Sequence, residues 1–169
     1  MNSPAINLFP DRLLDELTVK ANASPRGRAH LNVHASADDP VQRFFVMVNR
    51  HSYVRPHRHL TKSELGLVIR GAFDLIAFDD AGTVTARHVI GAVAGGSEGF
   101  AYESGQANWH TLVARVDGST FFEVKQGPYD AATASEFAPW APPEGDASVP
   151  QFMQWLRDAQ PGDAFRPAA

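Results

Sequence analysis

Two histidines and a glutamate stand close together near the middle of the chain, at a spacing that suits metal coordination. His57 and His59 are two residues apart, so both imidazoles leave the same face if this segment is an extended strand. Four residues then precede Glu64, which is enough chain to turn a corner and begin another strand. Imidazole and carboxylate are donors that first-row divalent metals prefer. The segment therefore predicts a metal site, with a metal-free structural His/Glu cluster as the alternative.

A fourth donor must come from a distant part of the chain. His110 is the best candidate, because it begins the strand-like run 110–115. Three imidazoles and one carboxylate would leave positions open on a five- or six-coordinate ion, where water or a substrate could bind. We expect one divalent ion, and zinc, iron, manganese and nickel all suit these donors.

Short predicted strands surround these four residues. Turn residues follow at Asp79–Gly82 and at Asp117–Gly118, and strands at this spacing are typical of a sandwich or barrel. A helix is predicted at residues 10–21, with Asp11 capping its first turn, and a second helix begins at residue 148. We expect residues 159–169 to be frayed. The predicted strands span residues 29–35, 42–49, 65–69, 71–78, 83–90, 100–102, 110–115 and 119–126.

The histidine and glutamate spacing is similar to a known motif. His57-x-His59, four residues, Glu64, six residues and Gly71 together resemble the first cupin motif. His110 stands where the second cupin motif has its histidine, although no asparagine follows it here. This resemblance implies that the four residues bind a metal ion inside a β-barrel.

Within the cupins, the chain resembles the WbuC-type cupin fold metalloproteins from about residue 24 to residue 144. The most specific likeness is the string Ser-Tyr-Val-x-Pro-His-Arg-His at residues 52–59, and Trp109-His110 and residues 123–129 also match. The resemblance implies an all-β fold: a single cupin double-stranded β-helix, or jelly roll, with short N- and C-terminal helices. It also implies a link to bacterial surface polysaccharides. The domains expected are an N-terminal helix and arm (1–28), the barrel (29–127) and a Pro- and aromatic-rich C-terminal wrap with a short helix (128–169).

Charged residues near these motifs are candidates for binding or catalysis. Glu123 and Lys125 share one face of the last predicted strand, where they are either an exposed charged pair or, if they face inward, groups that need a partner. Arg43 belongs to a local group of arginines that is either a solvated surface or the mouth of an anion site. We predict that Arg43, Lys125 and His34 bind a ligand, and that Lys125, Glu123 or Tyr53 supplies an acid or base.

Composition narrows the class of protein. The chain has 169 residues, of which 44% are hydrophobic and 20% are charged, as in an ordinary one-domain globule. A net charge of -4 argues against nucleic-acid binding. No apolar run is long enough for a membrane span, and residues 1–4 do not begin a secretory signal. The chain has no cysteine, which excludes disulfides and thiolate ligands and fits a cytoplasmic protein. A homodimer is expected.

Several functions fit these observations. The first is a metal-binding cupin with a pocket for a small polar or anionic ligand. As an enzyme it would be a metal-dependent dioxygenase, or a sugar isomerase or epimerase. The alternatives are a non-catalytic binder of a small metabolite and a barrel held together by a structural metal ion. The fold alone does not choose among them.

Overall fold

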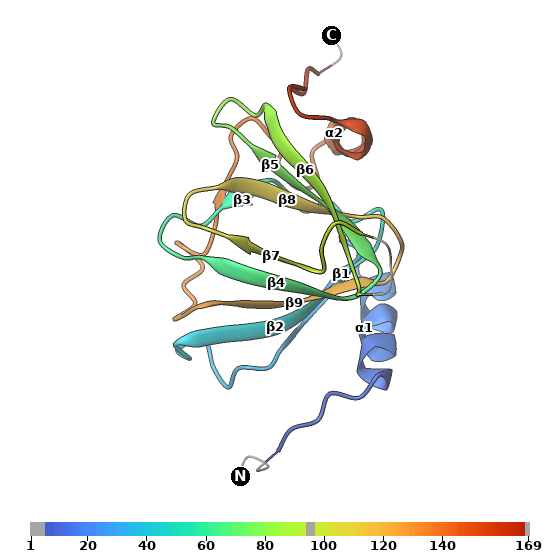
Figure 1. Ribbon diagram of the computed structural model, residues 1–169, viewed down its shortest axis with the longest axis vertical. Coiled ribbons are helices and arrows are strands. Elements are labelled where there is room, and N and C mark those ends of the chain that lie inside the picture. The colour runs from blue at the N-terminus through green and yellow to red at the C-terminus, as the bar shows by residue number, and fades with distance from the viewer. Residues whose placement is uncertain (1–5, 94–96, 168–169) are drawn as a thin grey trace.

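The chain forms two antiparallel sheets of five strands each (Figure 1). The computed structural model describes residues 6–93 and 97–167, so the expectations for residues 1–4 and for the last two residues lie outside the described residues. The first sheet has the order β1-β2-β9-β4-β7, and the second has the order β10-β3-β8-β5-β6. The strands of the first sheet are β1 (Arg28–Asn32), β2 (Val41–Val48), β9 (Ser119–Gln126), β4 (Glu64–Arg70) and β7 (Ala101–Ser104). Those of the second are β10 (Glu136–Phe137), β3 (His57–Arg58), β8 (Trp109–Ala114), β5 (Ala72–Phe78) and β6 (Val84–Gly91).

The two sheets enclose an apolar core. Val46 and Val48 of β2 and Phe121 of β9 pack there against Phe73 of β5 and Leu112 of β8. Alternation along β2 sends the next residues, such as Met47, to the opposite face, because successive side chains of a strand point in opposite directions. Both faces of β2 are apolar since each is covered, one by the second sheet and the other by a helix.

That helix is α1 (Arg12–Ala23), which lies on the outer face of the first sheet (Figure 1). Leu14 and Leu17 form its buried stripe and pack against Phe45 and Met47 of β2. The predicted helix is thus present, but the predicted cap is wrong, because Asp11 forms no side-chain cap bond. Its backbone is already helical, with φ -54° and ψ -34°, whereas a capping side chain needs an extended backbone to reach back.

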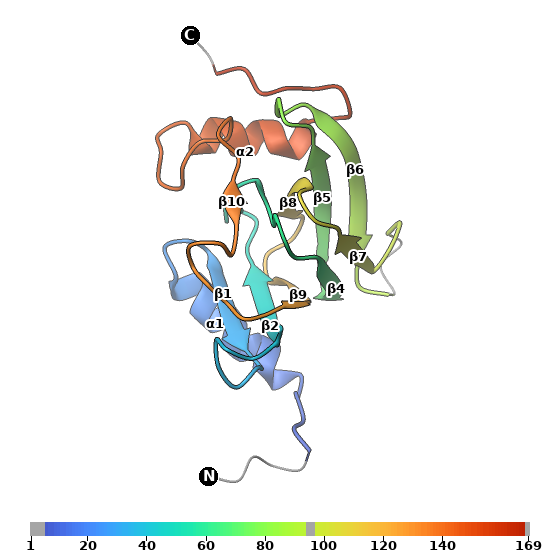
Figure 2. The same cartoon turned by 90° about the vertical axis from the view of Figure 1, so that its left-hand side faces the viewer.

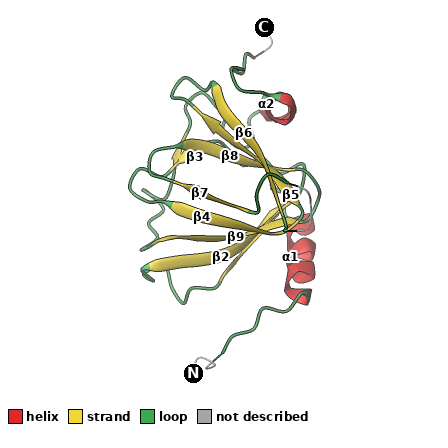
Figure 3. Ribbon diagram, in the orientation of Figure 1, coloured by secondary structure: helices red, strands yellow, loops and turns green. Residues whose placement is uncertain are grey.

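The second helix, α2 (Val149–Asp158), covers the outer face of the second sheet (Figures 2 and 3). Phe152 and Leu156 are fully buried there against Ile76 and other residues of that sheet. The tail beyond α2 is not frayed over residues 159–167, contrary to expectation. Phe165 packs on Phe152 with ring centroids 4.8 Å apart, and residue 164 forms a β-bridge to the β5–β6 turn. The tail is ordered because an aromatic side chain anchors it.

The predicted β5–β6 hairpin is confirmed and shows why its turn residues are needed. The Asp79 side chain accepts hydrogen bonds from the backbone N–H groups of Ala81 and Thr83, at 3.0 and 2.8 Å. Gly82 has a φ of +84°, which a residue with a side chain adopts only with strain. None of the helices in the described ranges is long and apolar enough to cross a membrane.

Candidate metal centre

Strands from both sheets bring the four predicted ligands together. His57 lies on β3 directly opposite His110 of β8, in the second sheet. Glu64 is the first residue of β4, in the first sheet, and His59 follows β3. One ligand atom from each of the four side chains lies within 4.8 Å of the others. The two histidine motifs, far apart in the sequence, therefore converge on one point between the sheets.

Backbone carbonyls orient the three imidazoles. The Nδ1 atom of His57 lies 2.9 Å from the Arg55 carbonyl oxygen, and that of His110 lies 3.0 Å from the Asn108 oxygen. The Nδ1 atom of His59 contacts the carbonyl oxygen of Ala134 in the same way. A carbonyl oxygen only accepts hydrogen bonds, so each Nδ1 carries the proton. Each Nε2 is then the nitrogen that is free to face the centre.

Glu64 supplies the carboxylate at the centre. One of its oxygens lies 2.9 Å from Nε2 of His59, and the other lies 2.7 Å from Nε2 of His110. The Tyr102 hydroxyl donates a further hydrogen bond to Glu64, at 3.2 Å. Tyr102 reaches this position because its cross-strand partner is Gly66, where an added Cβ would lie 2.2 Å from the tyrosine ring. The carboxylate is 3% exposed and held in place on both sides.

The protonation states follow from burial and from these contacts. Burial and the neighbouring His110 lower the pKa of His57 to about 3, so its imidazole is neutral near pH 7. Burial alone would raise the pKa of Glu64, but hydrogen bonds from His110 and His59 outweigh it and hold that pKa well below its ordinary value. Burial likewise disfavours charged His110, yet the hydrogen bond to Glu64 keeps its pKa above the ordinary value. Glu64 is therefore an anion, and hydrogen bonds from two imidazoles stabilise its charge.

These residues fit a divalent metal ion. The donor set is three imidazole nitrogens and one carboxylate, which suits zinc, iron, manganese or nickel. Metal binding would require Nε2 of His59 and of His110, which lie 2.9 and 2.7 Å from the Glu64 oxygens, to be free of protons. The Nδ1 contacts would keep the rings in place, as outer contacts do in established metal sites.

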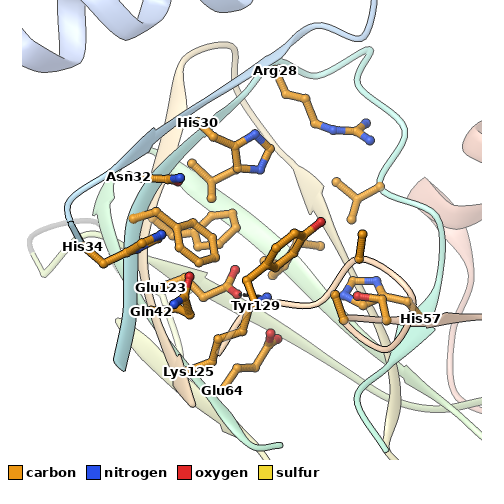
Figure 4. A pocket seen from close by; sticks show the side chains of 18 of the residues that line it. Arg28, His30, Asn32, His34, Gln42, His57, Glu64, Glu123, Lys125 and Tyr129 are labelled. Carbon is orange, nitrogen blue, oxygen red and sulfur yellow. Dashed lines mark ion pairs between the residues drawn. The ribbon is translucent and has the colours of Figure 1, made fainter. Parts of the chain in front are cut away.

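A cavity of about 900 Å³ opens onto the cluster (Figure 4). His57, Glu64 and His110 line it, so an ion bound there would have one side facing this space. Figure 4 shows Tyr129 lying across the cavity between His30 and His57. A cavity of this volume is the size of a small-molecule site.

Glu123 and Lys125 of β9 face into this cavity. Of the two alternatives that the sequence left open for them, the inward-facing pair is the one observed. Lys125 lies opposite Glu64 in the strand register, and its Nζ is 2.7 Å from a Glu123 carboxylate oxygen. Burial, together with the charge of Glu64, raises the pKa of Glu123 to about 7. The cavity thus holds an acidic group that can exchange a proton near neutral pH, next to a lysine (Figure 4).

The other predicted ligand-binding residues separate into one inside the cavity and one outside it. His34 lines the cavity, with its Nδ1 held 2.9 Å from the Arg43 carbonyl oxygen. Arg43 does not line the cavity: it alternates with Gln42 and Phe44, which do, and it forms an ion pair with Asp39 at 3.2 Å. The alternation of a strand therefore places the Arg43 side chain on the opposite face of β2.

Tyr53 also lies outside the cavity, so its position does not suit the acid or base role predicted for it. Its hydroxyl donates to the Pro142 carbonyl oxygen at 2.9 Å, and its ring packs against Phe152 of α2 at 5.8 Å between centroids. Burial raises its pKa, which makes deprotonation harder still. Tyr53 belongs to the core between the second sheet and α2.

A C-terminal strap, residues 128–138, completes the site and was not assigned to it from the sequence. Its β10 pairs with β3, so that Phe137 lies opposite His57, and the Ala138 N–H donates to the Pro56 oxygen at 2.9 Å. Ala134 provides the carbonyl that orients His59. The Pro- and aromatic-rich composition indicated a wrap around the barrel, but a backbone carbonyl has no residue signature that would reveal this contact.

Comparisons with known proteins identify the fold. Residues 9–90 match the model of a family described as a domain of unknown function, DUF6016. No curated protein sequence matches the chain. A solved structure from Klebsiella pneumoniae, an uncharacterised conserved protein with a double-stranded β-helix domain, is 14% identical, with a TM-score of 0.54. The match covers 81% of this chain and 98% of that one.

An enzyme structure gives the same result for the fold. Salicylate 1,2-dioxygenase from Pseudoaminobacter salicylatoxidans, in complex with gentisate, is 10% identical, with a TM-score of 0.54. That match covers 78% of this chain and 37% of the enzyme. At such low identities the likeness concerns the fold, and the predicted fold class is confirmed. The described chain has the fold of a single double-stranded β-helix, with two short helices packed on its outside.

Proposed function

We propose that this chain binds one divalent metal ion through His57, His59, Glu64 and His110, and that the adjoining cavity holds a small polar or anionic ligand. The observation that supports this most strongly is the shared orientation of the three imidazoles. Each has its Nδ1 fixed by a backbone carbonyl, and one donor atom from each of the four side chains lies within 4.8 Å of the others. An arrangement that only filled space would not need all three rings turned the same way.

A catalytic role is supported by the groups around the cluster. A bound divalent ion would supply a Lewis acid at this position, and iron or manganese would add redox chemistry. Beside it, Glu123 has a pKa of about 7 and lies against Lys125, so this pair can take up or release a proton at the cavity wall. This favours an isomerase or epimerase acting on a small polar substrate such as a sugar derivative, with a metal-dependent dioxygenase as the second candidate.

The chain resembles the WbuC-type cupin metalloproteins, and we propose that it belongs to that family. This resemblance supports a link to bacterial surface-polysaccharide metabolism.

The competing function is a non-catalytic binder of a small metabolite that uses the same ion as an anchor. Turnover of a sugar phosphate or keto acid by the metal-loaded protein would decide for an enzyme. Affinity for such a compound without turnover would decide for a binder. The homodimer and the cytoplasmic location stay predictions.

Metal content of purified protein tests the proposal. Elemental analysis should give about one divalent ion per chain in the wild type, and much less in a variant that carries both His57→Ala and His59→Ala, because two of four donors are gone. His88→Ala is a matched control, since the side chain of this histidine is 55% exposed and, among the described residues, forms a hydrogen bond only with Glu98. Unchanged metal content in the double variant would refute the proposal.

A further inference from the structure

The positive side chains of the cavity differ in whether they have an acidic partner. Arg26 and Arg28 both pair with Glu144, at 2.8 and 3.0 Å, and Lys125 pairs with Glu123 at 2.7 Å. Arg55 also lines the cavity, yet it forms no ion pair within residues 6–93 and 97–167. One cation of the cavity wall is therefore left without a counter-charge from the described chain.

The guanidinium of Arg55 is held in place but only partly satisfied. Its Nη2 donates to the carbonyl oxygen of Ala138 at 2.8 Å, and its central carbon lies 5.4 Å from the centroid of the Phe137 ring. Its Nε is buried and has no hydrogen-bond partner among the described residues. A buried donor without a partner is costly, and more so in a charged group. An oxyanion bound in the cavity against this guanidinium would supply the counter-charge that the described chain lacks.

Arg55 lies next to the candidate metal centre. Its own carbonyl oxygen orients His57, at 2.9 Å from Nδ1. The Phe137 ring lies against both side chains, with its centroid 6.3 Å from the centroid of the His57 ring. A ligand of a few atoms could therefore touch Arg55 with one end while its other end faces the cluster.

The charges of the wall favour an anion at this place. Among the described residues, three carboxylates line the cavity, and all three have partners: Glu144 and Glu123 pair with basic side chains, and Glu64 with imidazoles. The same space is lined by four basic side chains of the described part of the chain: Arg26, Arg28, Arg55 and Lys125. A bound divalent ion would add to the positive excess.

We propose that Arg55 is the anchor for an oxyanionic group, a carboxylate or a phosphate, of the ligand that the cavity holds. The planar guanidinium suits such groups because it offers donors in a fixed fork. The inference rests on the proposed function for the position of the ligand beside the metal centre, and it adds the chemical class of that ligand. Arg55 thus determines specificity.

Calorimetric titration tests the proposal in two stages. The metal-free protein is first titrated with Zn²⁺, and the loaded protein is then titrated with inorganic phosphate and, separately, with malonate. The variants are Arg55→Gln, Arg55→Lys and the control Arg43→Gln. Arg43 is a good control because its Nε is likewise buried without a hydrogen-bond partner, but its side chain does not line the cavity.

We expect the wild-type protein to bind at least one of the two anions. Arg55→Gln should bind that anion at least about tenfold more weakly, because a charge-assisted hydrogen bond is lost. Arg55→Lys should recover part of the affinity, since it keeps the charge but not the fork. Arg43→Gln should match the wild type. Preference for phosphate or for malonate tells which oxyanion the site takes.

The titrations distinguish failure of the proposed metal-binding function from failure of the role proposed for Arg55. If Zn²⁺ does not bind the wild type, the proposed function fails. If Zn²⁺ binds with equal affinity to the wild type and to Arg55→Gln, the variant is folded and the metal site is intact. In that case, equal anion affinities in the two proteins, or no binding of either anion by the wild type, would overturn the role of Arg55.

Discussion

At the scale of single residues, the centre depends on a carboxylate that stays charged although it is buried. Glu64 is 3% exposed, and it is kept anionic by the imidazoles of His59 and His110. Its charge would offset half of that of a divalent ion, which eases burial of the cation. The negative charge of this one side chain should therefore matter as much as its shape.

Glu64→Gln tests this point, because glutamine keeps the shape and removes the charge. We expect the affinity for a divalent ion to fall by at least about 100-fold, the upper end of what even an outer contact of a metal site contributes. Metal titration by calorimetry measures it. The matched control is Glu103→Gln, an exposed glutamate on β7. Equal metal affinity in Glu64→Gln and the wild type would show that the carboxylate is not a ligand.

Residue types explain which parts of the site the sequence predicts. His57, His59, Glu64 and His110 are predictable because few side chains bind metals and their spacing fits a known motif. The proposed anchoring role of Arg55 is not, since the sequence contains many arginines. Only the structure shows that Arg55, among the arginines that line the cavity, forms no ion pair with the described residues. Tyr53 and Arg43 were misplaced because a strand or loop position does not reveal which face becomes the cavity.

At the scale of elements, the C-terminal strap supports two of the four ligands. β10 pairs with β3 at His57, and the Ala134 carbonyl orients His59. We expect Ala138→Pro to weaken metal binding about 10- to 100-fold, because proline removes the N–H that donates to the Pro56 oxygen and loosens the strap.

A proline elsewhere in the strap serves as the control for this prediction. Ala131 is exposed, and its N–H makes no hydrogen bond to the described residues, so Ala131→Pro should keep wild-type metal affinity. Competition with a chromophoric chelator measures all three proteins. If Ala138→Pro, checked as folded by circular dichroism, binds metal as tightly as Ala131→Pro does, the strap does not position the ligands.

The β5–β6 turn gives a prediction about pH. The pKa of Asp79 is lowered chiefly by its hydrogen bond from the Thr83 backbone. A carboxyl group with a lowered folded pKa adds stability above its unfolded pKa of about 3.9, and that stability is lost as the pH falls through the folded value. Asp79→Ala should therefore lower the melting temperature at pH 7, and the difference from wild type should shrink below about pH 4.

Thermal melts at several pH values measure this difference. Asp38→Ala is the control, because Asp38 is exposed and its carboxylate accepts no hydrogen bond from the described residues. A melting difference for Asp79→Ala that stays constant from pH 7 to pH 3 would contradict the assigned role of its charge.

At the scale of the whole molecule, the packing that stabilises the second sheet and the candidate site lie on opposite faces of that sheet. The cavity opens on the inner side, whereas α2 and the tail cover the outer side. The alternating strands predicted the two-sheet architecture correctly, because the period of a strand is visible in the sequence. The ordered tail was not predictable, since it depends on contact between Phe165 and a helix that precedes it.

Phe152→Ala tests this separation. Phe152 is fully buried between α2 and the sheet, so its loss should lower the free energy of unfolding by about 3–5 kcal/mol. The exposed neighbour Gln151 provides a control, Gln151→Ala, with little expected change. Urea denaturation measures stability, and calorimetry measures metal affinity, which should stay near the wild-type value below the unfolding transition. A large loss of metal affinity in the folded variant would show that the outer layer supports the centre.

The central claim is that both sheets contribute ligands to one cation. X-ray diffraction from crystals of the protein as purified, recorded at the absorption edge of the metal found in it, would locate that ion directly. We expect one anomalous peak at about 2.0–2.2 Å from Nε2 of His57, His59 and His110 and from a carboxylate oxygen of Glu64. A metal-free cluster in protein that carries its metal elsewhere, or a peak that His110 or Glu64 does not touch, would contradict the claim.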